Sequence, residues 1–290
     1  MYFPFYKNKS ENQLMNEQSI GCDKKHKQFS LGILAIITLW FIFSLLLSSP
    51  SLPSLSPDES NDIEKLPNFS SFTNSQKKKQ AFFDFLFPII VDENLFLMQI
   101  RKQLKDLELK YKLQSLNSDE TEWLLELKED YLVESDDLDI IIKTLLKQVD
   151  IIPPSLVLAQ AAIESGWGTS RFAKKANNLF GHWCFSEGCG LVPKKRDDSK
   201  AHEVAKFDTI NESIRAYLKN LNSFHRYENF RTLRAQSTIK QTGKGVLKLV
   251  PGLEAYSEQG KLYIKKVTNL IKHNKLQRFD SLFIEQIDKN

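Results

Sequence analysis

The sequence predicts a mainly helical domain that carries one small β-hairpin and follows a single transmembrane helix. Three observations lead to this fold class. Residues 29–48 form an uncharged apolar run. Apolar residues recur at helical spacing through most of the chain after residue 76. One segment, residues 188–207, shows strand-type residues on both sides of a polar turn. The 290 residues are enough for a substantial core.

The apolar run "FSLGILAIITLWFIFSLLLS", residues 29–48, is long enough to cross the ~30 Å hydrocarbon core of a bilayer as a helix. A basic cluster at positions 24–27 precedes it, and acidic residues follow it. The positive-inside rule therefore predicts a cytoplasmic tail over residues 1–28 and an exported remainder. A cleaved signal peptide is the alternative, but the long polar lead favours an uncleaved signal anchor.

Residues 49–75 are rich in Ser, Pro, Asn and Asp and predict a flexible linker. The formal net charge of the chain is only +4, a bias too weak to indicate nucleic-acid binding. Residues 29–48 make a membrane the first expected partner.

Residues 76–150 are expected to form the helical N-terminal part of the outer domain. The stretch 77–113 has apolar residues at helical spacing, and we expect Pro88 to kink or break it. A second helix follows the polar cap in "NSDETEWLLELKEDYLV". A third is expected in "SDDLDIIIKTLLKQV", capped by Ser135 or Asp136.

Residues 151–290 are expected to complete the outer domain. Two prolines end the preceding helix and place Ser155 to cap the helix that carries Glu164. The hairpin is expected to turn at "DDSK", residues 197–200. Helices resume after a cap at Thr209 or Asn211.

The stretch "AQAAIESGWGTSRFAKKANNLFGHWCF" places Glu164 at the end of an alanine-rich helix that Gly166 terminates. Carbonyl groups at a helix C-terminus carry partial negative charge, so the protonated form of a carboxyl group is favoured there. Burial beside Trp167 would act in the same direction. A carboxylic acid that stays protonated near neutral pH suits general-acid catalysis at a glycosidic oxygen. A solvated helix-end glutamate is the alternative interpretation.

Aromatic and polar side chains near Glu164 are typical of a sugar-binding site. Aromatic rings fit the apolar face of a pyranose, although packing in the core is the alternative for Phe180. Asn177, Asn178 and His182 could supply hydrogen bonds to hydroxyl or acetamido groups. The expected substrate-binding residues are Trp167, Asn178, Phe180, His182, Trp183, Tyr217 and Tyr227.

Cys184 and Cys189 lie in "WCFSEGCG", on the predicted exported side, whereas Cys22 lies on the cytoplasmic side. Disulfides persist in exported proteins, and the short loop between the two cysteines allows a bridge. A zinc site that also uses His182 and His202 is the alternative. That spacing matches no compact zinc signature, so we expect a disulfide and neither a metal nor a cofactor.

The segment "AQAAIESGWGTSRFAKKANNLFG" resembles the glucosaminidase domain of glycoside hydrolase family 73, a group of lysozyme-like peptidoglycan hydrolases. "HWCFSEGCGLVP", "HEVAKFDTINESIRAYLKNL" and "LEAYSEQGKLYI" resemble its Bax-like, membrane-anchored bacterial branch. The resemblance covers about residues 77–275. It implies a lysozyme-like α+β fold with the glucosaminidase region at residues 151–290. It also implies glycan strands of peptidoglycan as partner and a location on the periplasmic or outer side of a bacterial inner membrane.

The same resemblance implies that Glu164 is the general acid and that Tyr256 takes part in catalysis. Many family members have a second glutamate on the first hairpin strand, where this sequence reads Pro-Lys-Lys-Arg at positions 193–196. Glu203, on the second strand, is the nearest substitute, and Glu187 is another. Both could instead be exposed hairpin charges.

The leading prediction is a peptidoglycan hydrolase of the endo-β-N-acetylglucosaminidase type that cleaves β-1,4 glycosidic bonds. With Glu164 as the only carboxylate, the 2-acetamido oxygen of the substrate would support hydrolysis. The muramic 6-hydroxyl would instead make the protein a lytic transglycosylase, which is the first alternative. A non-catalytic, membrane-tethered scaffold that binds the cell wall is the alternative from another class.

Overall fold

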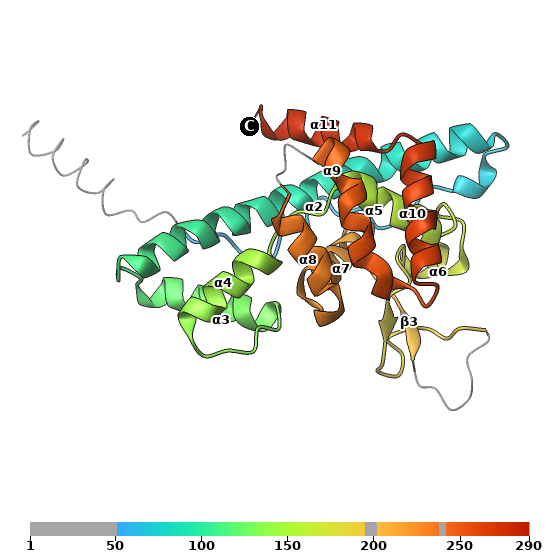
Figure 1. Ribbon diagram of the computed structural model, residues 1–290. Coiled ribbons are helices and arrows are strands. Elements are labelled where there is room, and N and C mark those ends of the chain that lie inside the picture. Colours follow the sequence, from blue (N-terminus) through green and yellow to red (C-terminus); the bar gives the residue numbers. More distant parts are fainter. Residues whose placement is uncertain (1–50, 195–201, 238–241, 290) are drawn as a thin grey trace, which may run out of the picture. The chain divides into compact units, whose positions relative to one another are not determined.

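The computed structural model describes residues 51–194, 202–237 and 242–289 (Figure 1). The predicted transmembrane segment and the predicted cytoplasmic tail lie outside these residues, so the signal anchor stays a prediction. Within the described ranges, no helix combines the length and the apolar character that a membrane crossing requires. Residues 52–290 cluster as one unit of the chain, and the description below concerns that unit.

The longest element is α2 (Ser75–Lys112), a helix of 38 residues that packs on much of the core. The side chain of Asn74 caps its start by accepting a hydrogen bond from the N–H of Lys77. Pro88 lies inside α2 and does not break it. Leu86 and Ile90 are fully buried on either side of Pro88, and this packing offsets the one helical hydrogen bond that a proline removes.

Two shorter helices follow, α3 (Ser118–Asp130) and α4 (Leu138–Gln148). A reciprocal pair of hydrogen bonds between Asn117 and Glu120 closes the first turn of α3, as expected from the polar cap. The cap of α4 is Asp137, one residue beyond the two predicted candidates. On α4, Ile141, Ile142 and Leu145 are buried, and the helix packs against α2.

Helix α5 (Pro154–Glu164) is the central element, because α2, α10 and α11 all pack against it (Figure 1). Every residue from Pro154 to Ala162 is buried. Ser155 does not cap the helix as predicted. Instead, its N–H and its hydroxyl both donate to the carboxylate of Asp280 on α11. Because Pro153 at the cap position has no side-chain acceptor, a carboxylate from a distant helix satisfies the first turn.

The remaining helices surround α5 and the site described below. Thr209 caps α7, which confirms one of the two predicted caps. In chain order these elements are α6 (Arg171–Ala176), α7 (Ile210–Ser223), the 3-10 helix η2 (His225–Tyr227), α8 (Glu228–Ala235), α9 (Thr242–Leu249), the 3-10 helix η4 (Val250–Tyr256), α10 (Lys261–His273) and α11 (Gln277–Ile287).

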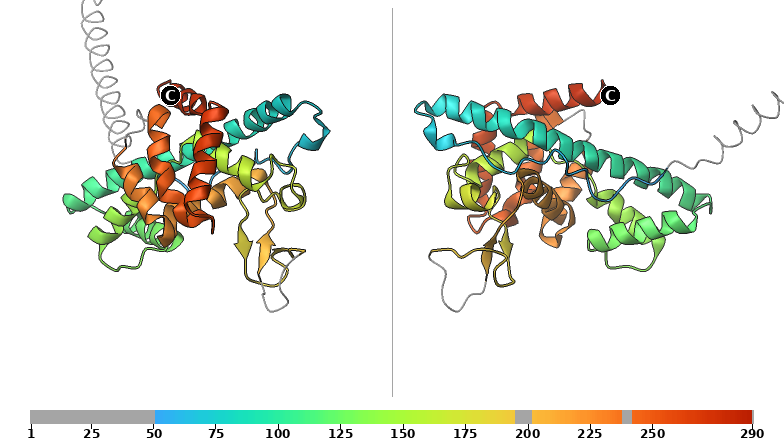
Figure 2. Two further views of the ribbon diagram at one scale, coloured as in Figure 1. Left: turned by 45° about the vertical axis from the view of Figure 1, so that its right-hand side comes forward. Right: turned by 180° about the vertical axis from the view of Figure 1, so that it is seen from behind.

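A small antiparallel sheet projects from the helical body, as both views in Figure 2 show. Its strands are β1 (Trp183–Cys184), β2 (Gly190–Leu191) and β3 (Glu203–Ala205), in the order β1-β3-β2. The predicted hairpin corresponds to β2 and β3, and β1 adds a strand that was not predicted. The predicted turn at residues 197–200 lies outside the described residues. Gly190 is required in β2, because a Cβ there would lie 2.0 Å from the carbonyl oxygen of Val204.

The chain from Leu52 to Asn74 is packed rather than free. Leu52, Leu55, Ile63 and Leu66 pack against the core, and Phe69 in the 3-10 helix η1 (Phe69–Ser71) is buried. Backbone bonds add to this packing, since the N–H of Ile210 donates to the carbonyl of Ile63. The flexible linker expected over residues 49–75 is therefore wrong from Leu52 onward, because apolar residues spaced among the Ser and Pro residues find partners in the core.

Candidate active site

Glu164 is the last residue of α5, and a tight left-handed turn follows it. Gly166, Trp167 and Gly168 have φ angles of 58°, 61° and 70°. The turn is closed by the N–H of Trp167, which donates to the carbonyl of Ala162, and by the N–H of Gly168, which donates to the Ser165 hydroxyl. This turn fixes the end of the helix and with it the backbone of Glu164.

Trp167 packs toward α2. Its ring meets Phe82 and Phe83 edge-on, at centroid distances of 5.9 and 5.3 Å, and the Lys79 ammonium lies 5.0 Å from the ring centroid. A positive φ is costly for a residue with a large side chain, and this packing offsets the cost. The indole therefore holds the turn against α2, and its expected role in binding a sugar stays a prediction.

Tyr263 of α10 is the direct partner of Glu164. Its hydroxyl donates to Glu164 Oε1 at 2.8 Å, although the two residues are 99 positions apart in the chain. Our sequence reasoning missed this residue. A usable signal was present: Tyr263, Val267 and Ile271 are spaced four residues apart on the buried face of α10. A tyrosine hydroxyl on a buried face needs a polar partner.

Two further buried side chains, Gln160 and Tyr217, form hydrogen bonds behind Tyr263. Gln160, one turn before Glu164 on α5, donates its Nε2–H to Tyr263 Oη at 2.9 Å. Its Oε1 accepts the hydroxyl proton of Tyr217 at 2.6 Å. Tyr217 and Gln160 are fully buried. Tyr217 was expected to bind substrate, but its burial and its bond to Gln160 place it behind the site.

Burial raises the pKa of Glu164, while the hydrogen bond from Tyr263 and the positive charge of Lys266 act in the opposite direction. The net direction is the one expected from the sequence. The largest cause is desolvation of the half-buried carboxyl group. The group can therefore hold a proton at a higher pH than an ordinary glutamate.

Tyr256 lies beside this pair. Its ring stacks on Tyr263 with centroids 5.5 Å apart and an interplanar angle of 10°. Its hydroxyl donates to the carbonyl oxygen of Phe180 at 3.0 Å, not to Glu164. Tyr227, another expected binding residue, is buried and lies with its ring centroid 6.1 Å from that of Tyr256. The aromatic cluster around Tyr256 therefore links the Phe180 loop to the Glu164 pair.

The loop after α6 uses its amide side chains internally. Asn178 donates to the carbonyls of His182 and Ala205 and accepts from the N–H groups of Gly181 and His182. These four bonds use the donors and acceptors of the amide within the loop, so Asn178 shapes the loop, and its expected role in binding substrate stays a prediction. Asn177 likewise donates to three carbonyl groups.

Phe180 and His182 lie on the same loop. Phe180 is buried and stacks on Tyr217 at 4.0 Å, which agrees with the core alternative. Within the described residues, both ring nitrogens of His182 are buried without a hydrogen-bond partner. Burial lowers the pKa of His182 to about 4, so the imidazole is neutral at physiological pH. His182 thus keeps one donor and one acceptor unused, and its role in binding stays a prediction.

The sheet presents aromatic groups to solvent. The Trp183 side chain is 57% exposed and stacks on His202 with ring centroids 4.0 Å apart. Phe185 is more exposed still, at 76%. Of the aromatic residues expected to contact sugar rings, Trp183 is the one with an open face.

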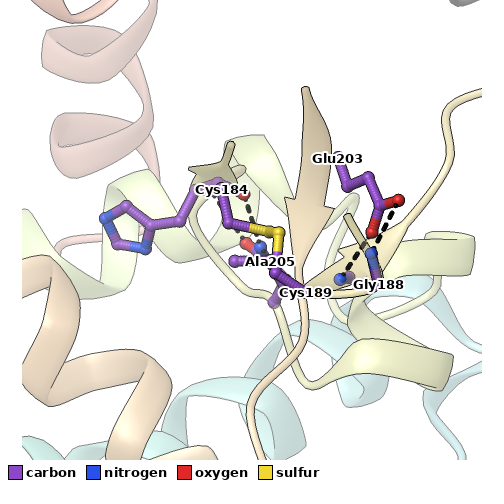
Figure 3. The surroundings of a disulfide bond; sticks show 8 residues. Cys184, Gly188, Cys189, Glu203 and Ala205 are labelled. Atoms are coloured by element: carbon purple, nitrogen blue, oxygen red, sulfur yellow. Dashed lines mark hydrogen bonds between the residues drawn. A yellow bond between two sulfur atoms is a disulfide. The ribbon is translucent and has the colours of Figure 1, made fainter. Parts of the chain in front are cut away.

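Figure 3 shows the predicted disulfide between Cys184 and Cys189, which is confirmed. Because the thiols are bonded to each other, they cannot serve as the ligands of the alternative zinc site. Glu203 lies on β3 next to this loop and is only 6% exposed. Its carboxylate accepts hydrogen bonds from the N–H groups of Gly188 (3.3 Å) and Gly190 (2.8 Å). The expectation of an exposed hairpin charge is wrong for Glu203, and its bonds favour a structural role over a catalytic one.

Glu164 lines neither of two cavities elsewhere on the domain. One, of about 350 Å³, lies between α2, α3, α7 and residues 55–59. The other, of about 430 Å³, lies near α6 and the start of α7. The candidate site is therefore defined by Glu164, its hydrogen-bond partners and the adjacent sheet.

Comparisons with known proteins identify the family of the chain. Residues 141–276, which include Glu164, Tyr256 and Tyr263, match the family model of the glucosaminidases, described as mannosyl-glycoprotein endo-β-N-acetylglucosaminidase. The chain belongs to this glucosaminidase family of glycoside hydrolases.

A curated relative is Protein bax of Escherichia coli (strain K12). It is 32% identical over 216 residues, which cover 68% of this chain and 70% of the relative. Among solved structures, the catalytic domain of the autolysin Auto from Listeria monocytogenes matches with a TM-score of 0.40 and 18% identity, covering 72% of this chain and 92% of that one. The family match confirms the predicted resemblance. The elements described above confirm the mainly helical fold with a small sheet.

Proposed function

We propose that the protein is a peptidoglycan hydrolase that cleaves β-1,4 glycosidic bonds, of the endo-β-N-acetylglucosaminidase type, with Glu164 as general acid. The observation that carries the proposal is the environment of Glu164 within the family motif. Its carboxyl group is half-buried, its pKa is raised, and Tyr263 holds one of its oxygens. The resemblance of residues 141–276 to a family named for glucosaminidase activity supports the reaction class.

The hydrogen bond to one carboxyl oxygen of Glu164 determines which oxygen would deliver the proton to the substrate. Glu164 Oε1 accepts the hydrogen bond from the Tyr263 hydroxyl, so the acidic proton of Glu164 is carried on Oε2. Transfer of this proton to the glycosidic oxygen lets the bond to the anomeric carbon break with an oxocarbenium-like transition state. The proton leaves with the sugar that departs, and Glu164 becomes a carboxylate.

A substrate-assisted route supports the second half of the reaction. The proposed mechanism uses Glu164 as its one catalytic carboxylate. Glu203, the nearest substitute from the sequence, is engaged by the loop. The 2-acetamido oxygen of the substrate can then attack the anomeric carbon. Water would open the resulting ring and return a proton to Glu164, which restores the enzyme.

The same single carboxylate favours one second candidate, a lytic transglycosylase, in which the muramic 6-hydroxyl replaces water. We also propose that residues 29–48 anchor the protein in the inner membrane with the domain exported. The Cys184–Cys189 disulfide supports export, because disulfides persist in oxidising compartments.

Product analysis distinguishes these candidates. Purified sacculi are incubated with the protein, and the products are identified by mass spectrometry. New reducing ends on N-acetylglucosamine support the proposed hydrolase, and anhydro-muramic ends support the transglycosylase. Intact glycan with retained binding would instead point to the scaffold and contradict the enzyme. Glu164→Gln should abolish these products, and Glu258→Gln, at an exposed position within the same matched range, is its control.

A further inference from the structure

Three hydrogen bonds join four side chains from three helices into one chain that ends on Glu164. Tyr217 Oη donates to Gln160 Oε1 at 2.6 Å, and Gln160 Nε2 donates to Tyr263 Oη at 2.9 Å. Tyr263 Oη then donates to Glu164 Oε1 at 2.8 Å. Tyr217, Gln160 and Tyr263 are buried, and only Glu164 reaches a half-exposed position.

The order of donors and acceptors in this chain has a physical cause. A phenol hydroxyl has a single proton, and a carboxamide has one end that donates and one that accepts. Because Tyr217 gives its proton to Gln160 Oε1, the amide must present Nε2–H to Tyr263. Tyr263 Oη is then an acceptor toward Gln160, so its own proton is free for Glu164. Each acceptor along the chain fixes the role of the next group.

We propose that Tyr263 is a positioning residue for Glu164, and that Gln160 and Tyr217 fix the direction of its hydrogen bond. This inference rests on the proposed role of Glu164 as general acid. The bond occupies Oε1 and leaves Oε2 to carry the proton toward the substrate. After proton transfer, the same bond stabilises the carboxylate, since hydrogen bonds to charged groups are stronger than those between neutral ones.

The titratable and charged groups around Glu164 come from several elements. Helix α10 contributes Tyr263 and Lys266, η4 contributes Tyr256, and α7 contributes Tyr217. On α2, Lys79 lies over the ring of Trp167. On α11, Asp280 binds at the opposite end of α5. Of these groups, Tyr263 alone donates a hydrogen bond to the Glu164 carboxylate in the described structure.

The decisive variant is Tyr263→Phe, tested in the full chain in detergent micelles. In the wild type, the hydrogen bond from Tyr263 favours the ionised carboxylate of Glu164. The variant lacks this bond, so the pKa of Glu164 should rise further. The alkaline limb of the kcat profile should then move to higher pH. The maximal kcat on sacculi should fall about 10-fold or more, the scale of a hydrogen bond to a charged group.

Tyr256→Phe is the matched control. It removes a hydroxyl from the neighbouring ring of the same stack, but that hydroxyl donates to the Phe180 carbonyl. The alkaline limb should therefore stay in place whatever happens to the rate. Tyr217→Phe leaves the Gln160 amide free to reverse, so a smaller shift in the direction of Tyr263→Phe is expected. Thermal unfolding of each variant shows whether it is folded.

A titration independent of activity separates this inference from the proposed function. The ¹³C-carboxyl signal of Glu164 is assigned by its loss in Glu164→Gln and followed with pH in the wild type and in each Tyr→Phe variant. A higher pKa in Tyr263→Phe but not in Tyr256→Phe supports the inference. An unchanged pKa in a folded Tyr263→Phe protein overturns it, even if the wild type cleaves glycan. Wild-type protein that cleaves no glycan overturns the proposed function, while the titration still decides the hydrogen bond.

Discussion

At the scale of single residues, the protein places two carboxyl groups in surroundings that disfavour their charge, one at each end of α5. Glu164 ends the helix and is held by Tyr263, and Asp280 binds the first turn through Ser155. Burial is the main cause of the raised pKa in both cases. The two groups differ in access, because Asp280 is fully buried whereas Glu164 is half-exposed. Only Glu164 can meet a substrate.

Glu164→Gln should lower turnover on sacculi by at least about 100-fold, the usual scale for general-acid help. Glutamine preserves the shape and can still accept the Tyr263 hydrogen bond, but it cannot transfer a proton. Glycan binding in pull-down assays and the unfolding temperature should change little. A fully active variant would remove Glu164 from the mechanism.

Asp280 should make stability depend on pH. Its pKa is raised to about 7 in the folded protein, well above the value of about 3.9 for an unfolded chain. The contribution of this group is therefore fully present below pH 4 and is lost as the pH rises through 7. Each pKa unit corresponds to about 1.4 kcal/mol, so the change is on the order of a few kcal/mol.

Asp280→Asn, which resembles the protonated form, should lack this part of the pH dependence in urea unfolding between pH 4 and 8. If the free energy of unfolding depended equally on pH in both proteins, Asp280 would not titrate in this range.

At the scale of elements, helix α5 differs from the small three-stranded sheet β1-β3-β2, which we call the arm. Helix α5 is buried from Pro154 to Ala162 and is hydrogen-bonded to other helices at both ends. The arm is held together by the Cys184–Cys189 disulfide and by hydrogen bonds to the Glu203 carboxylate. These different supports indicate different roles. The helix fixes the position of Glu164, and the arm presents an exposed indole at Trp183.

Glu203→Gln tests the role of the arm. The amide can replace only one of the two carboxylate oxygens as an acceptor for Gly188 and Gly190, so the domain should lose about 1–2 kcal/mol of stability. Turnover should fall less than 10-fold. A drop in turnover comparable to that of Glu164→Gln would make Glu203 the second catalytic carboxylate.

Local patterns predicted most elements but few contacts. The apolar face of α4, the Thr209 cap and the disulfide are properties of a few neighbouring residues, and the sequence shows them directly. The partners of Glu164 and Ser155 are 99 and 125 residues away. The spacing on α10 indicates that Tyr263 is buried, but no local pattern shows which residue it contacts. The hydrogen bonds of Asn178 within its own loop were likewise not visible in the sequence, because a polar side chain beside a motif can bond to nearby backbone or to a ligand.

At the scale of the whole molecule, the packed segment 52–74 belongs to the domain. A protein starting at Leu52 should therefore be more stable than one starting at Gln76, because the shorter one exposes the pocket of Phe69 and loses the contacts of Leu55 and Ile63. Burying one large apolar side chain is worth about 1.5–3 kcal/mol, and several are lost. Equal urea midpoints for the two proteins would contradict this assignment of the segment.

The membrane topology is testable with the full chain. The basic residues at positions 24–27 predict a cytoplasmic N-terminus and an exported domain. A reporter that works only outside the cytoplasm should be active when fused after Asn290. An inactive fusion of normal abundance would make the orientation wrong, and mature protein that lacks residues 1–48 would indicate signal cleavage.

The bonds at the two ends of α5 also concern the order in which the chain is made. Glu164 is synthesised long before Tyr263 on α10 and Asp280 on α11, which hold the helix that carries it. A nascent chain that ends near Gly260 has its acid but neither of these contacts. The hydrogen bonds that hold Glu164 and its helix can therefore form only after α10 and α11 have been synthesised. Under the proposed function, a chain interrupted during synthesis would therefore not cleave peptidoglycan.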